Sequence, residues 1–240
     1  MDRYPRRGTH GQTVHDLGRR IVQGDFAPGQ VIDMEQLERE FDASRPAIRE
    51  ALRVLAAKGL LDARPRRGTF VRPRGDWSLL DPDLLRWQVE LKPDAVFLAS
   101  LDEVRQIVEP AGSRLAALRR TPEHLERMEA ALTVMAADAE SNEHTIEADL
   151  DFHRTLLNAA GNELLDRMEI VIEAGLRVRD QLVHAGHGWS EAAVAHEAVL
   201  AAVRNRDEQT AEDAMRSLLA LSARDASTLG RGENPDRPLG

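Results

Sequence analysis

The chain has 240 residues, 42% of them hydrophobic and 30% charged, with no cysteine and a net charge of −9. This composition allows one or two domains with a substantial core, and the absence of cysteine excludes disulfides and thiolate metal sites. The sequence has no long apolar run and no signal-peptide pattern, so we expect a soluble, cytoplasmic protein with no membrane partner. Residues 1–75 hold 15 Lys and Arg against 10 Asp and Glu, whereas the remainder holds 17 against 31, so only the first part is suited to meet a polyanion.

Three helical patterns follow one another in the basic part of the chain. Residues 13–24 carry apolar side chains at helical spacing and stop at a glycine. Residues 33–41 begin with Asp33 as a suitable N-cap, and residues 44–59 begin with Ser44 in the same role. Only a three-residue polar turn separates the second and third helices.

A hairpin pattern comes directly after the third helix. The stretch LLDARPRRGTFVRP reads as two short strands around a turn rich in Arg and Gly. Three helices and a hairpin, with a short turn between the last two helices, predict a winged helix-turn-helix domain over residues 1–75.

The third helix is the candidate recognition helix, because such a helix contacts base edges from its first turns. Arginine there can bind guanine with two hydrogen bonds, and an arginine-rich wing suits phosphates or the minor groove. The alternative is a solvated arginine helix beside a charged loop. The predicted DNA-binding residues are Ser44, Arg45, Arg49, Arg66, Arg67 and Gly68.

The rest of the chain is predicted to be helical. Residues 76–95 read as a linker that runs into a short helix over 82–91, and residues 230–240 read as a disordered tail. Between them, residues 96–229 show helical apolar spacing throughout, with about six helices and no convincing strand. The fold class is therefore mainly α, with a C-terminal all-α antiparallel bundle.

The stretch EADLDFHRTLLNAAGN, residues 147–162, places Asp149 and His153 on the same helix face as four apolar residues. His196 lies likewise on an apolar stripe. Three inward polar side chains from two helices can converge in a bundle core and hold a divalent metal ion; the sequence does not distinguish among Zn, Mn, Fe and Ni. A buried, hydrogen-bonded Asp–His pair without metal is the alternative.

Longer motifs carry a family resemblance. PGQVIDMEQLEREFDASRPAIREALRVLAAKGLLDARPRRGTFV resembles the DNA-binding domain of GntR-type bacterial transcription regulators, apart from Ala43, where the family usually has a β-branched residue. LDEVRQIVEPAGSRLAA, DLDFHRTLLNAAGN and HEAVLAAVRNRDEQTAEDAMRSLL resemble the FadR-type effector-binding domain. The resemblance implies a homodimer on double-stranded operator DNA, with contacts from Arg45, Arg49 and Gly68.

The resemblance also bears on the metal ligands. In metal-binding members an Asp and three histidines hold a divalent ion; Asp149, His153 and His196 match three of them, and the fourth falls on Leu218, which cannot bind metal. The resemblance therefore implies a three-ligand site with positions open to water or effector.

Arg105 shares an apolar stripe with its neighbours in LASLDEVRQIVEPAG, and it matches a family arginine that anchors an effector carboxylate. The alternative is a salt bridge to Glu109 one turn on, worth about 0.3–0.5 kcal/mol if exposed. His184 and His187 read as loop histidines without a ligand role.

Together these patterns predict a repressor that leaves its operator when a small carboxylate effector, a sugar acid or hydroxy acid, binds the bundle. The stretch GDWSLLDPDLLRW resembles the linker of regulators of sugar-acid catabolism. Three alternatives stay open: an activator, a bundle that serves only for dimerisation, and a metal-dependent enzyme. The enzyme is disfavoured because no separate general base is apparent.

Overall fold

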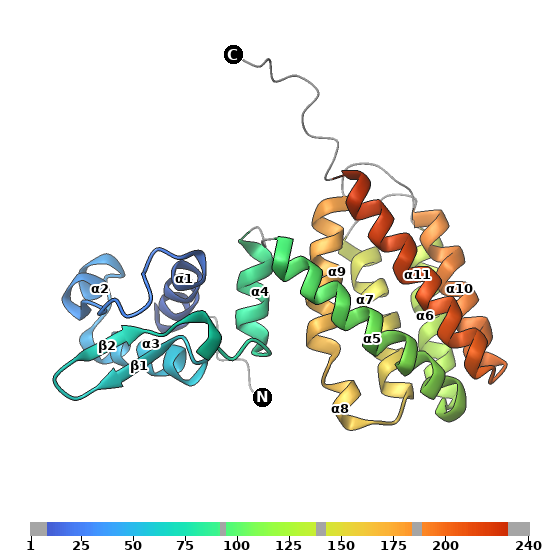
Figure 1. The fold of residues 1–240 in the computed structure, drawn as a ribbon, viewed down its shortest axis with the longest axis horizontal. Coiled ribbons are helices and arrows are strands. Elements are labelled where there is room, and N and C mark those ends of the chain that lie inside the picture. The colour runs from blue at the N-terminus through green and yellow to red at the C-terminus, as the bar shows by residue number, and fades with distance from the viewer. Residues whose placement is uncertain (1–8, 92–94, 138–142, 184–188, 230–240) are drawn as a thin grey trace, which may run out of the picture. The chain divides into compact units, whose positions relative to one another are not determined.

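The chain forms two compact units, residues 1–93 and 94–240 (Figure 1). The structure, a computed structural model, describes residues 9–91, 95–137, 143–183 and 189–229. The predicted disordered tail and the loop histidines His184 and His187 lie outside these described residues. Within them, no helix is long and apolar enough to cross a membrane.

The first unit confirms the predicted winged helix-turn-helix. Its elements are α1 (Thr9–Gln23), α2 (Met34–Glu40), α3 (Arg45–Ala57), β1 (Leu61–Arg64), β2 (Gly68–Val71), the 3-10 turn η1 (Arg74–Asp76) and α4 (Pro82–Glu90). Asp33 caps α2 by accepting hydrogen bonds from two backbone N–H groups at 2.9 and 3.1 Å. Ser44 occupies the N-cap position of α3 with extended backbone angles, but its side chain makes no capping hydrogen bond.

The wing is a two-stranded antiparallel hairpin in which Leu61 lies opposite Val71 and Arg64 opposite Gly68. The extended segment before α2 adds to it, because the N–H of Ile32 donates to the carbonyl of Thr69 at 2.8 Å. This third segment covers the outer edge of β2 and ties the wing to the helices.

The short helix α4 packs against α1. Trp87 of α4 is fully buried, and its indole N–H donates to Nδ1 of His15 at 2.9 Å. Gly18 makes the close approach possible, since a Cβ there would lie 2.4 Å from the Trp87 ring. Lys58, at the end of α3, reaches Asp81 and Asp83 at the start of α4 at 2.9 and 2.8 Å.

The second unit is an all-helical bundle, as predicted, and its described residues contain no strand. Its helices are α5 (Ala95–Arg119), α6 (Pro122–Ala137), α7 (Glu143–Ala159), α8 (Glu163–Asp166), α9 (Glu169–Val183), α10 (Trp189–Arg204) and α11 (Glu208–Leu229). The bundle also contains α8, a helix of a single turn between α7 and α9. Asn162 explains it, because its side chain accepts the N–H of Leu164 at 3.0 Å.

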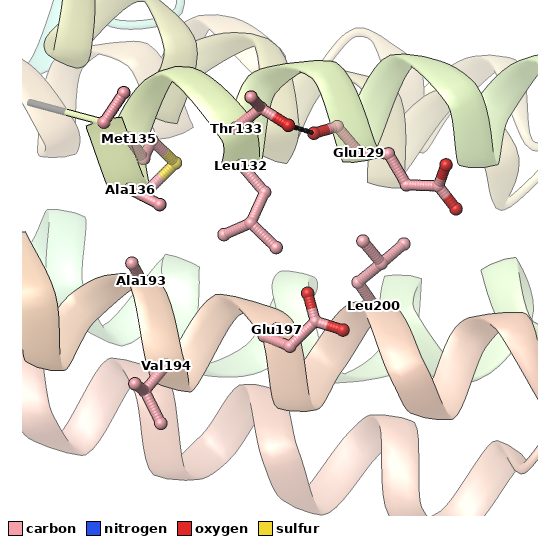
Figure 2. A pocket seen from close by; sticks show the side chains of 10 residues that line it. Glu129, Leu132, Thr133, Met135, Ala136, Ala193, Val194, Glu197 and Leu200 are labelled. Atoms are coloured by element: carbon pink, nitrogen blue, oxygen red, sulfur yellow. Dashed lines mark hydrogen bonds between the residues drawn. The ribbon is translucent and has the colours of Figure 1, made fainter.

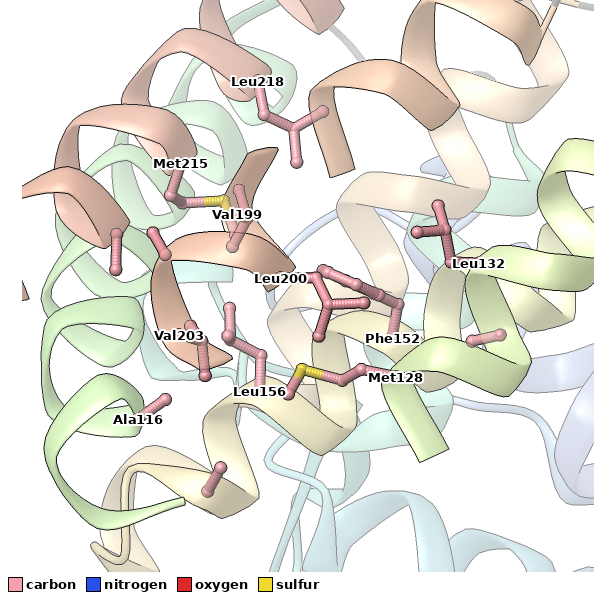
Figure 3. Packing of buried hydrophobic residues seen from close by; sticks show 14 of the residues in the cluster. Ala116, Met128, Leu132, Phe152, Leu156, Val199, Leu200, Val203, Met215 and Leu218 are labelled. Atoms are coloured by element: carbon pink, nitrogen blue, oxygen red, sulfur yellow. The ribbon is translucent and has the colours of Figure 1, made fainter. Parts of the chain in front are cut away.

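The core of the bundle lies among α5, α6, α7, α10 and α11 (Figure 3). Phe152 and Leu156 of α7 are fully buried there, beside Leu200 of α10 and Met215 of α11. Each large apolar side chain removed from water contributes about 1.5–3 kcal/mol. Both α7 and α10, the two helices with the predicted metal ligands, contribute to this core.

Candidate functional site

The outer face of α3 carries the predicted base-reading residues. Ile48 and Leu52 turn inward to the core, while Ser44, Arg45 and Arg49 are exposed. The Nε of Arg45 lies 3.7 Å from a carboxylate oxygen of α2. Arg49 makes no side-chain hydrogen bond or ion pair within the described residues, so its guanidinium is available to another molecule.

The wing presents a second set of exposed arginines. The Arg67 guanidinium lies 4.1 Å from the centre of the Phe70 ring, which holds it in place. Arg66 stands at the tip with a positive φ of 64°, and Gly68 has a φ of 82°. These positions suit contact with a DNA groove, and the individual contacts stay predictions.

The three predicted metal ligands meet in the core of the bundle. Asp149 and His153 come from α7 and His196 from α10, and none is more than 1% exposed. Oδ1 of Asp149 lies 2.9 Å from Nε2 of His196 and 3.7 Å from Nε2 of His153. The two Nε2 atoms are 3.2 Å apart. One carboxylate oxygen and two ring nitrogens therefore converge on one point.

The partners of the other ring nitrogens assign the protons. Nδ1 of His196 is 2.7 Å from the carbonyl oxygen of Ala192, which can only accept, so this nitrogen carries the hydrogen. Nδ1 of His153 lies 2.5 Å from a carboxylate oxygen of Glu109, which can only accept, so the hydrogen of this ring is assigned to Nδ1 as well. In their neutral forms, both rings then present Nε2 lone pairs toward Asp149. These two lone pairs and the Asp149 carboxylate oxygen repel each other unless they share a cation, either a proton or a metal ion.

The spacing fits a metal ion. Bonds of about 2.0–2.2 Å to nitrogen and oxygen place adjacent ligands of a tetrahedral or octahedral ion roughly 2.8–3.6 Å apart, close to the three separations in the cluster. Leu218, where the resemblance places a fourth ligand, is 1% exposed within the apolar core. The cluster can therefore hold a metal through three protein atoms.

A buried ion pair adjoins the cluster. Nε of Arg105 donates to Oε1 of Glu109 at 2.6 Å, and both residues belong to α5. Burial alone would raise the pKa of Glu109, but the charge of Arg105 and the interaction with His153 outweigh it and lower that pKa to about 2. Burial also opposes the charge of Arg105, yet Glu109 outweighs it and raises the pKa of the guanidinium. The salt bridge considered from the sequence is thus present, and it is buried.

Two neighbours shape this site. Phe152 meets both imidazoles edge-on, with ring centres 5.8 Å from His153 and 5.0 Å from His196, and so adds an apolar wall. Gly175 of α9 makes room for Arg105, because a Cβ there would lie 2.7 Å from Cδ of the arginine. Helix α9 therefore closes over the arginine as well.

A separate groove lies between α6 and α10 (Figure 2). Leu132 and Leu200 point toward one another across it, and Glu129 and Glu197 line its rim. Its lining includes neither the three converging ligands nor Arg105. An apolar groove with acidic groups does not suit a carboxylate ligand.

Comparison with known proteins connects both units to one family. Residues 9–71 match the model of bacterial regulatory proteins of the gntR family, and residues 101–221 match the FCD domain. The galactonate operon transcriptional repressor of Escherichia coli K12 is 36% identical over 214 residues, which cover 88% of this chain and 93% of that protein. The chain belongs to the GntR family. It is a transcription regulator with an FCD domain, and not an enzyme.

Other relatives agree with this assignment. The HTH-type transcriptional repressor NanR of Klebsiella aerogenes is 27% identical over 225 residues, covering 91% of this GntR regulator and 85% of NanR. A solved chain described as Lar, which controls the agr system of Listeria monocytogenes, shares the fold. Its TM-score is 0.61 at 19% identity, and the match covers 95% of this chain and 100% of that one.

Glu109 has one contact that the sequence of this GntR regulator did not predict. The sequence suggested Glu109 only as an alternative partner for Arg105, whereas the carboxylate also contacts His153. The signal was present: Glu109 is a charged residue on an apolar stripe, one turn after Arg105. Its contact with α7 depends on how two helices pack, and helical periodicity does not report that.

Proposed function

We propose that this GntR regulator is a cytoplasmic homodimeric repressor that leaves its operator when a small hydroxy acid, such as galactonate, binds in the FCD domain. The proposal rests on one observation: Asp149, His153 and His196 converge in the core, and Arg105 is held beside them through Glu109. The galactonate operon repressor among its relatives gives the chemical class of the effector.

The residues divide the recognition of such an acid between them. A divalent metal held by the three ligands would supply a Lewis acid for the carboxylate and α-hydroxyl oxygens of the ligand. Within the described residues, the Arg105 side chain has one hydrogen bond, through Nε. Its terminal nitrogens are left to bind the carboxylate in the bidentate geometry typical of arginine.

Burial of the cluster favours coupling to DNA binding. Because all three ligands are at most 1% exposed, an acid reaches them only when the surrounding helices move. Helix α5, which carries Arg105, begins at Ala95, directly after the boundary between the two units. A ligand that binds better in a rearranged bundle shifts the population toward it and changes the half-site spacing that a dimer can span.

Three exposed apolar side chains on one face of α5 support the proposed dimer. Val96, Ile107 and Leu118 are 77%, 72% and 44% exposed and follow one another every 11 residues, close to three helical turns. Exposed apolar side chains of this kind gain stability when they pack on the same surface of a second copy. Two copies would present two recognition helices to a palindromic operator.

The decisive experiment measures release of DNA. The full chain first selects duplexes from a random pool, and fluorescence anisotropy then gives its affinity for them with Mn²⁺ and D-galactonate, gluconate or lactate. We expect at least one acid to weaken binding, and EDTA to abolish this response. Unchanged DNA affinity with every acid, in the presence of metal, would contradict the effector role and favour a bundle that serves only for dimerisation.

A further inference from the structure

Glu109 links the two halves of the proposed site. Its side chain is fully buried, and each of its oxygens lies against a different residue. Oε1 accepts from Nε of Arg105 at 2.6 Å, and Oε2 lies 2.5 Å from Nδ1 of His153. A counter-charge for Arg105 alone would need no second contact on another helix.

The two histidines are oriented by different means. His196 donates its Nδ1–H to a carbonyl one turn earlier on its own helix, so its tautomer is set within α10. The acceptor facing Nδ1 of His153 is Glu109, which comes from α5. The direction in which Nε2 of His153 points therefore depends on a residue outside its own helix.

We propose that Glu109 is a positioning residue that turns Nε2 of His153 toward the metal and, with its other oxygen, aims the terminal nitrogens of Arg105 toward the effector. This inference rests on the proposed metal and effector site. A carboxylate that holds the second ring nitrogen fixes the tautomer of a metal-binding histidine and makes it a stronger ligand. Here the same carboxylate orients the anion-binding arginine, so metal binding and effector binding share one support.

Zinc affinity, measured by competition with a chromophoric chelator, tests the proposal. Glu109→Gln keeps the shape of the side chain and removes its charge, and we expect zinc to bind about 10- to 100-fold more weakly. The matched control is Glu173→Gln, the same change at a partly buried glutamate of α9 that pairs with Arg154 and Arg177. This control should bind zinc as the wild type does.

A second readout separates positioning from general support of the fold. Nitrogen-15 NMR of the histidine rings in metal-free protein reports which nitrogen carries the hydrogen. In the wild type, His153 should carry it on Nδ1, and Glu109→Gln should shift the ring toward a mixture of tautomers. The signal of His196 should stay unchanged, because its acceptor is a backbone carbonyl.

The outcomes distinguish this inference from the proposed function. If Asp149→Asn loses zinc while Glu109→Gln binds it as the wild type does, the role of Glu109 is wrong and the metal site stands. Equal weakening by Glu109→Gln and Glu173→Gln would also overturn it. If Asp149→Asn binds zinc like the wild type, the metal lies elsewhere and both proposals fall. Should Glu109→Gln not fold, zinc affinity is measured instead on the double variant Arg105→Gln with Glu109→Gln, in which both charges of the ion pair are removed.

Discussion

Arg49→Ala should weaken sequence-specific DNA binding without weakening the fold. The side chain is exposed and makes no hydrogen bond or ion pair within the described residues, so its removal leaves no buried partner unpaired. A bidentate contact between arginine and guanine contributes about 1–3 kcal/mol of discrimination. Since about 1.4 kcal/mol corresponds to a tenfold change, affinity should fall roughly 5- to 150-fold.

Fluorescence anisotropy with duplexes selected by the wild type measures this loss at one fixed salt concentration. Arg53→Ala is the matched control, because Arg53 lies one turn further along α3 with its side chain 82% exposed. Arg49→Ala should also relax the preference at one base position, whereas Arg53→Ala should change affinity evenly across sequences. Full sequence-specific affinity in Arg49→Ala would remove this residue from base recognition.

Three further predictions follow from the packing. Replacing His153 and His196 by alanine should abolish bound metal in elemental analysis, and unchanged stoichiometry would refute the site. Gly18→Ala should destabilise the first unit by about 1–3 kcal/mol in urea unfolding, because the new Cβ overlaps the Trp87 ring; in an open helix the same change would stabilise. Lys58→Met should cost about 2 kcal/mol, less than the ~3–5 kcal/mol of a fully buried pair, because the side chain is still 12% exposed. Burial opposes the charge of Lys58, but contacts with two carboxylates outweigh it and raise the pKa of the amine. The charged amine therefore contributes its full stabilisation below the unfolded value of 10.5 and loses it as the pH rises through the folded pKa. The difference in unfolding free energy between the wild type and Lys58→Met should close in strong alkali.

Helical periodicity predicted most of the fold, because each helix buries one face. The sequence pattern predicted α3, and the structure confirms that Asp33 caps α2. Two features of the fold could not be predicted from helical periodicity. Helix α1 begins at Thr9, four residues before the first predicted helical position, because the polar stretch THGQ carries no apolar period. Helix α4 packs on α1 through the fit of Trp87 to Gly18, a long-range contact that no local pattern records.

Most of the candidate site could likewise be predicted from the sequence. Asp149 and His153 were recognisable because a carboxylate and an imidazole on an apolar stripe need an inward partner. The stripe that holds His196 pointed to the same core, and the structure brings the three together. The second contact of Glu109 was not predictable, since it joins α5 to α7 and depends on the packing of the two helices.

The most direct test of the proposed site is a calorimetric titration of the full chain with D-galactonate, once loaded with Mn²⁺ and once stripped with EDTA. The loaded protein should bind one acid per chain, and the stripped protein should bind it far more weakly or not at all. Equal affinity in the two states, or no binding in either, would contradict a metal-assisted galactonate site in the helical unit.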